Sequence, residues 1–386
     1  MNLCFVTNQY VSKFSGGIES VTLILSSMFA QKGYNTFLLS ARRPMNSSLK
    51  LRNQFVLPNS TIDCKENRQY ISSFIKKHHI DIFINQSEVK AILELIKSCS
   101  STTPVISVIH TDPKAAIKAV QDNWDFWKLQ YGPIKFILLS PYLYLRRLYQ
   151  MYTRKKYTKE KHQYYHYQSD AVVLLSEKFF KSFKKISGIT KTSKLFAISN
   201  PSTVNTQQAN LTEKENIVLF VGRLVFQKRL DRLFRIWKRI KDTKDWKLII
   251  LGDGPDKVFY ETLCKKWNVK NIEFAGQCDP HPFYHKAKIL CMTSSFEGSP
   301  CVLQEAIQNG IVPIVFNSFE SATDIIDNKR NGFLIKPFSI KEYSRTLEQL
   351  ISKYNYEICS DNNILEPAEE DKIYLQWESL FKCVTN

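Results

Sequence analysis

Residues 3–40 read LCFVTNQYVSKFSGGIESVTLILSSMFAQKGYNTFLLS, and the order of elements in this stretch decides the fold. An apolar run, Leu3–Thr7, precedes a glycine pair, a segment with apolar residues at helical spacing, Ile18–Lys32, and a second apolar run, Thr36–Ser40. Short apolar runs of this kind are typical of buried parallel strands, and the periodicity between them predicts a helix. We therefore expect a strand–helix–strand unit of a parallel sheet.

The same alternation continues along the chain. Further strands are predicted at Asp81–Asn85, Val105–His110, Ala171–Leu175, Leu195–Ser199, Asn216–Val221, Lys247–Leu251, Ile272–Ala275, Ile289–Met292, Val312–Phe316 and Phe333–Ile335, with later helices near 228–241, 256–267, 300–309 and 340–353. A polar stretch, Ser202–Glu215, interrupts the alternation. Because one core rarely exceeds roughly 250–300 residues, the 386 residues predict two domains. The expected fold class is α/β, with two Rossmann-like doubly wound domains, 1–200 and 201–367, facing a central cleft, and a helix at 368–386 packing back on the first.

Composition bounds the class of protein. A hydrophobic fraction of 44% suffices for large cores and excludes a disordered or low-complexity protein. The 54 Lys and Arg residues against 36 Asp and Glu leave a charge of +18, which indicates an anionic partner without identifying it.

Nine cysteines are scattered and never spaced as Cys-x-x-Cys. They predict buried thiols in a reducing compartment and neither disulfides nor a zinc site. The first residues lack the pattern of a signal peptide, and no apolar run reaches the ~18 residues that span a bilayer. We expect a cytoplasmic protein, peripheral on the inner face of the cell membrane.

More than half of the excess charge lies between Lys135 and Lys194, where fourteen basic residues face three acidic ones. Within it, Ile134–Tyr152 mixes leucine, isoleucine and tyrosine with basic residues. This mixture suits a helix in a membrane interface. A long helix whose basic face packs on its own domain and a nucleic-acid contact are the open alternatives.

Two glycine motifs lie where strands end. Gly16 and Gly17 precede a helix and would let an anion approach its N-terminus, although a plain turn gives the same pattern. Gly222 and Arg223 follow the first strand of the second domain, and Lys228 comes soon after. The two cations could neutralise a diphosphate, or they could be solvated bases opening a basic helix that continues through Arg232.

Two carboxylates and a histidine complete the candidate set. Glu297 precedes a helix that Pro300 should begin and Gly310 should end, and Glu305 lies within it. A carboxylate there could accept bonds from ribose hydroxyls, with a solvated pair of glutamates as the alternative. His110 ends a strand and either bonds a substrate hydroxyl or finishes the core.

Taken together, these residues resemble the retaining glycosyltransferases of family 4, which have the GT-B fold. The resemblance rests on Gly16-Gly17-Ile18-Glu19, Gly222-Arg223-Leu224 with Lys228, Gly252-Asp253-Gly254-Pro255, and the Glu297-x7-Glu305 pattern with Ala306 and Gly310. It is strong over 216–337 and looser over 1–200.

The resemblance implies a role for each matching position. Arg223 and Lys228 would neutralise the diphosphate, Glu305 would hold the nucleotide ribose, Glu297 would lie against the donor sugar, and His110 would touch that sugar. The predicted donor-binding set also contains Gly16, Gly17, Gly222, Gly298, Ser299, Pro300, Cys301 and Val302. Thr111 stands where the family often has an acid, and Asn200-Pro201 replaces a commoner Asn-Gly.

The implied reaction is a metal-independent, retaining transfer of a hexose from a UDP- or GDP-linked sugar, without a cofactor. The sequence agrees with a metal-independent reaction, because the chain has no Asp-x-Asp motif and because fixed cations can stabilise the leaving diphosphate. The expected partners are a saccharide or lipid-linked saccharide acceptor of bacterial surface polysaccharide assembly, lipopolysaccharide or capsule, and an anionic membrane surface, but not nucleic acid. A sugar-nucleotide 2-epimerase and a non-enzymatic anion-binding protein are the rival functions.

Overall fold

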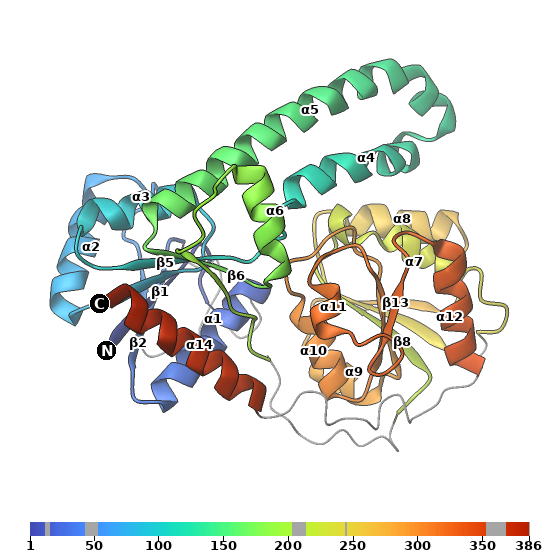
Figure 1. Cartoon of the computed structure of the whole chain (residues 1–386). Helices are drawn as coiled ribbons and strands as arrows, with labels where there is room; N and C mark the ends of the chain where they lie inside the picture. Colours follow the sequence, from blue (N-terminus) through green and yellow to red (C-terminus); the bar gives the residue numbers. More distant parts are fainter. Residues whose placement is uncertain (12–15, 43–52, 203–213, 244, 353–367, 386) are drawn as a thin grey trace. The chain divides into compact units, whose positions relative to one another are not determined.

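The computed structural model describes residues 1–386 except 12–15, 43–52, 203–213, 244, 353–367 and 386 (Figure 1). The chain divides into two compact units. The first contains Met1–Lys114, Arg154–Thr203 and Pro367–Asn386, and the second contains Ala115–Thr153 and Val204–Glu366. This division differs from the predicted one in 115–153, which group with the second unit. Most of the predicted polar linker and Cys359 lie outside the described residues.

The first unit is built on a seven-stranded parallel sheet in the order β3-β2-β1-β4-β5-β6-β7. Its strands are β1 (Asn2–Thr7), β2 (Asn35–Ser40), β3 (Gln54–Val56), β4 (Ile82–Asn85), β5 (Val105–Ile109), β6 (Ala171–Leu174) and β7 (Leu195–Ala197). Its helices are α1 (Gly17–Gln31), α2 (Lys65–His78), α3 (Lys90–Cys99), α6 (Lys178–Ser187) and α14 (Ala368–Thr385). In α14, Trp377 and Phe381 pack their rings against Phe29 of α1, which joins the end of the chain to this unit.

The second unit has a six-stranded parallel sheet in the order β10-β9-β8-β11-β12-β13. Its strands are β8 (Ile217–Val221), β9 (Lys247–Leu251), β10 (Ile272–Gly276), β11 (Ile289–Met292), β12 (Val312–Phe316) and β13 (Phe333–Ile335). Its helices include α7 (Leu230–Trp237), α8 (Lys257–Lys266), α9 (His281–Lys286), α10 (Cys301–Gln308), α11 (Ala322–Ile325) and α12 (Ile340–Ser352).

Helices cover both faces of the second sheet, because alternate residues of each strand enter different cores. Val218 and Phe220 pack with α7, α8 and α12, whereas Ile217 and Leu219 pack with α9, α10 and α11. In such sheets ligands bind beyond the carboxyl ends of the strands, where the strand order reverses. That point lies between β8 and β11 in the second sheet and between β1 and β4 in the first.

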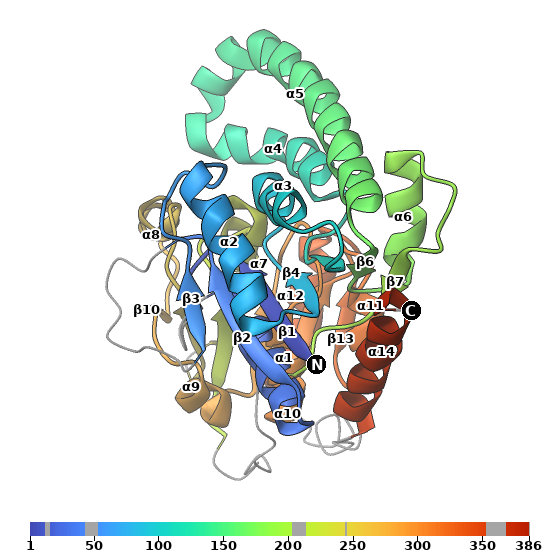
Figure 2. The ribbon, with the colours of Figure 1, turned by 90° about the vertical axis from the view of Figure 1, so that its left-hand side faces the viewer.

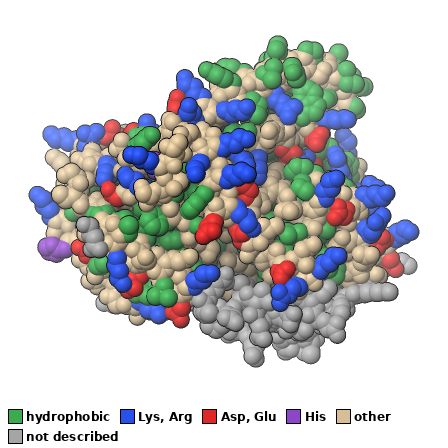
Figure 3. All heavy atoms as spheres, viewed as in Figure 1, with side chains coloured by type: hydrophobic (Ala, Val, Ile, Leu, Met, Phe, Trp, Pro, Cys, Tyr) green, Lys and Arg blue, Asp and Glu red, His purple; other side chains and the backbone are tan. Residues whose placement is uncertain are grey.

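An antiparallel pair of helices is inserted between β5 and β6 (Figures 1 and 2). These helices are α4 (Ala115–Tyr131) and α5 (Pro133–Gln168), joined at Gly132. Trp127 of α4 packs against Phe136 and Leu143 of α5. Hydrophobic side chains also gather on the outer surface near this turn (Figure 3).

Two details differ from the sequence predictions. The helix expected at 228–241 begins at Leu230 and ends at Trp237, because Phe226–Lys228 form a short 3₁₀ turn and Arg229 is left-handed (φ 51°). The cysteines within the described ranges are free but not all buried, since Cys278 and Cys383 are exposed. Among the helices in the described ranges, none combines the length and hydropathy needed to cross a bilayer.

Candidate active site

The glycine motifs of the second unit let two loops touch. Leu224 N–H donates to the carbonyl of Asp253 at 2.9 Å. A Cβ atom on Gly252 would lie 2.0 Å from the Gly222 oxygen, and one on Gly254 would lie 2.4 Å from the Leu224 oxygen. Both distances are far below a possible contact, so glycine is required where the loops after β8 and β9 meet.

Lys228 and Glu297 form an ion pair at the carboxyl edge of the second sheet. The Lys228 Nζ lies 2.7 Å from the Glu297 Oε1, and the two side chains are only 15% and 9% exposed. Gln227 Nε2 donates to the other Glu297 oxygen at 3.1 Å. The two loops follow β8 and β11, which are neighbours at the reversal of strand order. The solvated glutamate considered from the sequence is therefore wrong for Glu297.

Gly222 leaves the space that Lys228 occupies. A Cβ at Gly222 would lie 3.3 Å from the Lys228 Cε. Arg223, the next residue, is exposed. The loop after β8 thus presents one cation in an ion pair with a carboxylate and a second cation towards solvent.

A buried cluster of charged residues follows the loop after β8 and holds it in place. Arg229 is paired with Asp231 at 2.8 Å and with Asp122 at 2.5 Å, and Arg232 also contacts Asp122. Ser295 donates to Asp122 as well. Two guanidinium groups and two carboxylates balance in charge, as burial requires. Arg232, through which the alternative of a basic helix would continue, is only 4% exposed and is not a solvated base.

The cluster changes the pKa of its arginines in opposite directions. Burial opposes the charge of both side chains. For Arg229, Asp231 and Asp122 outweigh burial and raise the pKa, whereas burial and the neighbouring Arg229 lower the pKa of Arg232.

Helix α4 runs along the carboxyl edge of the second sheet. Its Lys118 donates to the Ser318 carbonyl after β12 at 2.9 Å, and its Asp122 reaches Ser295 after β11. One turn further, Phe126 packs its ring on Phe226 after β8, with centroids 4.8 Å apart. These contacts connect the inserted helix to the loops that carry the candidate residues.

Glu305 is held by a tyrosine. It lies in α10, is half-buried, and accepts a hydrogen bond from the Tyr284 hydroxyl at 2.5 Å. Burial and the Glu305 charge raise the pKa of Tyr284 well above its usual range, so Tyr284 stays a donor. The helix begins at Cys301 with Pro300 as its N-cap, one residue later than predicted. Gly298, Ser299 and Val302 surround its N-terminus.

In the first unit, His110 follows β5 and is 8% exposed. Its Nε2 lies 2.5 Å from Gln86 Oε1, and its backbone N–H donates to Glu88. Glu88 also accepts from Thr111 and pairs with Lys161 at 2.7 Å. Thr111, the residue next to the histidine, is thus bonded through its N–H and its hydroxyl to the carboxylate of Glu88.

Burial lowers the pKa of His110 to about 4, although Glu88 acts in the opposite direction. Burial alone would raise the pKa of Glu88, but Lys161 and His110 together bring it below its usual value. At neutral pH this pocket therefore holds a neutral imidazole beside a charged carboxylate.

Gly16 and Gly17 lie at the start of α1, after β1. Glu19 in the first turn is 9% exposed, and burial raises its pKa despite a bond to its own backbone. A Cβ on Gly17 would meet nothing within 4 Å. A Cβ on Gly16, in contrast, would lie 3.1 Å from the Glu19 Oε2, so a carboxylate stands beside this helix start.

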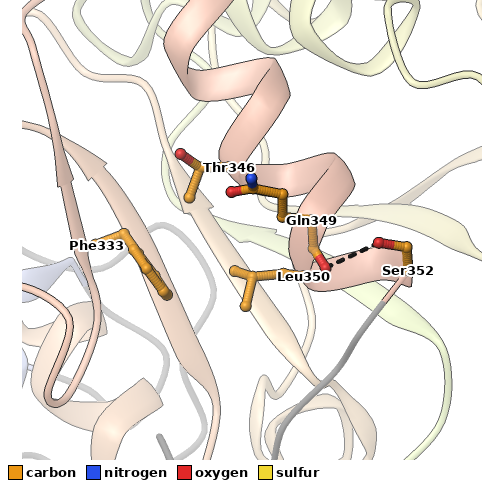
Figure 4. Close-up of a pocket in the computed structure, with 5 residues that line it drawn as sticks. All are labelled: Phe333, Thr346, Gln349, Leu350 and Ser352. Atoms are coloured by element: carbon orange, nitrogen blue, oxygen red, sulfur yellow. Dashed lines mark hydrogen bonds between the residues drawn. The ribbon is translucent and has the colours of Figure 1, made fainter.

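A cavity of about 320 Å³ lies elsewhere (Figure 4). Phe333, Thr346, Gln349, Leu350 and Ser352 line it. Phe333 begins β13, so the cavity opens at the amino edge of the parallel sheet, opposite the loops described above. None of the candidate site residues predicted from the sequence lines this cavity. Across the part of the chain that the structure describes, no three His, Cys, Asp or Glu side chains form a group able to hold a metal ion.

Comparisons with known proteins match the segment that carries the loops of the second unit. Residues 202–364 match the family Glycosyl transferases group 1, which confirms the resemblance to glycosyltransferases for that segment without specifying family 4. The amylovoran biosynthesis glycosyltransferase AmsD of Erwinia amylovora is 35% identical over 143 residues, 36% of this chain and 39% of AmsD.

A second relative is a glycosyltransferase of Campylobacter jejuni. The GalNAc-alpha-(1->4)-GalNAc-alpha-(1->3)-diNAcBac-PP-undecaprenol alpha-1,4-N-acetyl-D-galactosaminyltransferase of Campylobacter jejuni is 29% identical over 182 residues, 45% of this chain and 50% of that protein. This chain spans about half the length of the curated relatives it matches.

Among solved structures, Anabaena HepE in complex with UDP and glucose has a TM-score of 0.71 at 13% identity, covering 99% of both chains. At that identity the likeness shows the fold alone. The fold is GT-B, as expected from the sequence.

Proposed function

We propose that this chain, which carries a glycosyl transferases group 1 segment at 202–364, is a retaining glycosyltransferase of bacterial surface polysaccharide assembly. It would move a sugar from a nucleotide-diphosphate donor to a saccharide acceptor. The observation that carries the proposal is the pairing of Lys228 with Glu297 at the reversal of strand order, beside the exposed Arg223.

In this proposal the donor's diphosphate lies between Arg223, Lys228 and the N-terminus of α10. Cations and helix N-terminal N–H groups are the usual partners of phosphate. Glu305 accepts from the ribose hydroxyls, and its bond to Tyr284 fixes the carboxylate for that task. Glu297 faces the donor sugar and returns to Lys228 when the site is empty.

The nucleotide is proposed to be uridine or guanosine diphosphate. The Anabaena HepE structure contains UDP, which supports uridine by analogy of fold only. No cofactor or metal is proposed, because the cations of the β8 loop can stabilise the charge that develops on the leaving diphosphate.

The reaction is proposed to take place on one face of the sugar. The bond from the anomeric carbon to the phosphate oxygen breaks, the bond to the acceptor oxygen forms, and the acceptor's proton passes to the leaving phosphate. His110 contacts the sugar as a neutral imidazole. Because its Nε2–H donates to Gln86, its Nδ1 is an acceptor for a sugar hydroxyl.

A lipid-linked saccharide is the proposed acceptor. The name of the Campylobacter relative includes PP-undecaprenol, and this supports the class without fixing the sugar or linkage. The rival 2-epimerase reaction would convert a nucleotide sugar in the absence of any acceptor.

Binding and turnover test the proposal separately. UDP or GDP should raise the melting temperature of the protein, because a ligand that binds only the folded state stabilises it. Arg223→Ala should lose that shift. If no nucleoside diphosphate changes the melting temperature, or if sugar conversion needs no acceptor, the proposal is wrong.

A further inference from the structure

The first half of α5 carries nine large hydrophobic side chains that are 50–77% exposed. They are Ile134, Ile137, Leu138, Tyr142, Tyr144, Leu145, Leu148, Tyr149 and Tyr152. Elsewhere in the described chain such exposure is scattered, as at Val258 and Leu375. Neighbouring exposed apolar residues in this number indicate a surface that contacts a partner.

The nine side chains share one side of the helix. At about 100° per residue they fall within an arc of roughly 160°, over a length of roughly 27 Å. On the opposite side, Phe136 and Leu143 are buried and pack on Trp127. We call the exposed arc the outer face of α5, defined by the nine residues above.

No charged residue interrupts the outer face. Its nearest basic neighbours lie over aromatic rings of α4. Arg146 lies 5.5 Å from the ring centroid of Trp127, Arg147 5.9 Å from that of Trp124, and Lys135 5.9 Å from that of Tyr131. Apolar and basic residues that are mixed in the sequence are therefore separated in space.

Basic residues appear on the same arc only where the outer face ends. Continuing at about 100° per residue brings Lys155, Lys156 and Lys159 onto the arc, with a single acidic residue, Glu160, at its edge, and all four are exposed. Along this side of α5, an apolar surface is therefore followed by a mainly basic one, which we call the cationic end.

We propose that the outer face of α5 docks on an anionic lipid surface. Its leucine and isoleucine side chains would enter the boundary between headgroups and acyl chains, the tyrosines would lie at that boundary, and the three lysines would contact headgroup phosphates. A row of exposed apolar side chains along one side of a helix suits a bilayer surface. Within the described residues no helix is long and apolar enough to cross a bilayer, so this one would lie on the surface. A second copy of this chain would bring further lysines and its own +18 charge to the same surface.

Vesicle flotation of the full chain tests the proposal without nucleotide or sugar, so its result is independent of the proposed reaction. Vesicles of phosphatidylcholine with phosphatidylglycerol are compared with phosphatidylcholine alone. The doubly substituted Leu138→Glu/Leu145→Glu protein should bind the anionic vesicles at least about tenfold more weakly. The matched control is Val258→Glu/Leu375→Glu, which places two charges at equally exposed apolar sites.

The cationic end has its own comparison. Lys155→Glu/Lys156→Glu/Lys159→Glu should abolish the preference for anionic vesicles, whereas Lys181→Glu/Lys184→Glu/Lys185→Glu, exposed lysines of α6, should weaken it only slightly. Absence of binding at low salt overturns the proposal, as does equal binding of the outer-face and control variants. A dimer that the outer-face variant converts to monomer, with vesicle binding unchanged, identifies a second copy as the occupant and also overturns it.

Discussion

Lys228 and Glu297 are joined by a 2.7 Å contact between loops that follow adjacent strands, β8 and β11. Under the proposed function, Lys228 would meet the diphosphate of the donor, and this contact holds its ammonium group beside a carboxylate before the donor arrives. The pair keeps the ammonium in place without a phosphate, and it makes the stability of the edge depend on both residues. Arg223 is exposed, so its removal should affect the stability of this edge less.

Lys228→Ala and Arg223→Ala should therefore separate stability from activity. Each removes a charge-assisted contact to the diphosphate, so kcat/KM should fall roughly 10–100-fold in both. Only Lys228→Ala leaves Glu297 buried beside no cation, which should lower the free energy of unfolding by about 1–3 kcal/mol. Urea unfolding and initial rates measure the two effects. Wild-type turnover in either variant would refute the assignment.

Asp122→Asn should destabilise the second unit. It leaves Arg229 and Arg232 with one buried carboxylate, Asp231, and the unbalanced charge should lower the free energy of unfolding by about 3–5 kcal/mol. Asp125→Asn, at an exposed position of the same helix, should change it by less than about 0.5 kcal/mol. Urea unfolding gives both values, and equal stability of the two variants would contradict the bracing role of Asp122.

Tyr284→Phe should weaken donor binding more than it weakens the fold. Without the hydroxyl, Glu305 loses the bond that orients it, and KM for the donor should rise roughly 5–10-fold while kcat changes little. Tyr343→Phe is the matched control, because its hydroxyl donates to the buried carbonyl of Ile314, on the strand β12. If both variants raise KM equally, Tyr284 acts on the fold and not on Glu305.

The sequence predicted the sheets well because buried parallel strands are continuous apolar runs. β9, β11, β12 and β13 have the predicted bounds, whereas β3 was missed because Gln54–Val56 is too short to show a pattern. The loops of the second unit were predicted from their glycines. The structure shows why glycine is needed there, because the loops after β8 and β9 are in close contact.

Partners distant in sequence could not be predicted. Asp122 lies 173 positions from Ser295, and Glu88 lies 22 from His110. A single acidic residue on an amphipathic helix looks the same whether it is solvated or buried against two arginines. Only the packing of α4 on the sheet edge distinguishes these cases. The same holds for α5, where periodicity alone did not reveal which side is covered.

The lowered pKa of His110 predicts how the stability of the protein depends on pH. Its pKa is about 4 in the folded protein and 6.5 for an unperturbed histidine, so between these values the unfolded chain binds a proton that the folded protein does not. The stability that depends on a neutral His110 is complete above pH 6.5 and is lost as the pH falls to 4. The loss amounts to about 3 kcal/mol for a shift of this size.

His110→Gln removes that titration. Between pH 7 and pH 4.5 the variant should lose about 2–3 kcal/mol less unfolding free energy than the wild type, in urea unfolding at both pH values. His162, whose pKa burial also lowers to about 4, remains in both proteins and cancels from the comparison. Parallel pH dependences would mean that His110 is solvated and charged at pH 5. In that case it could not act as the neutral acceptor of a sugar hydroxyl, and its proposed role would fail together with its burial.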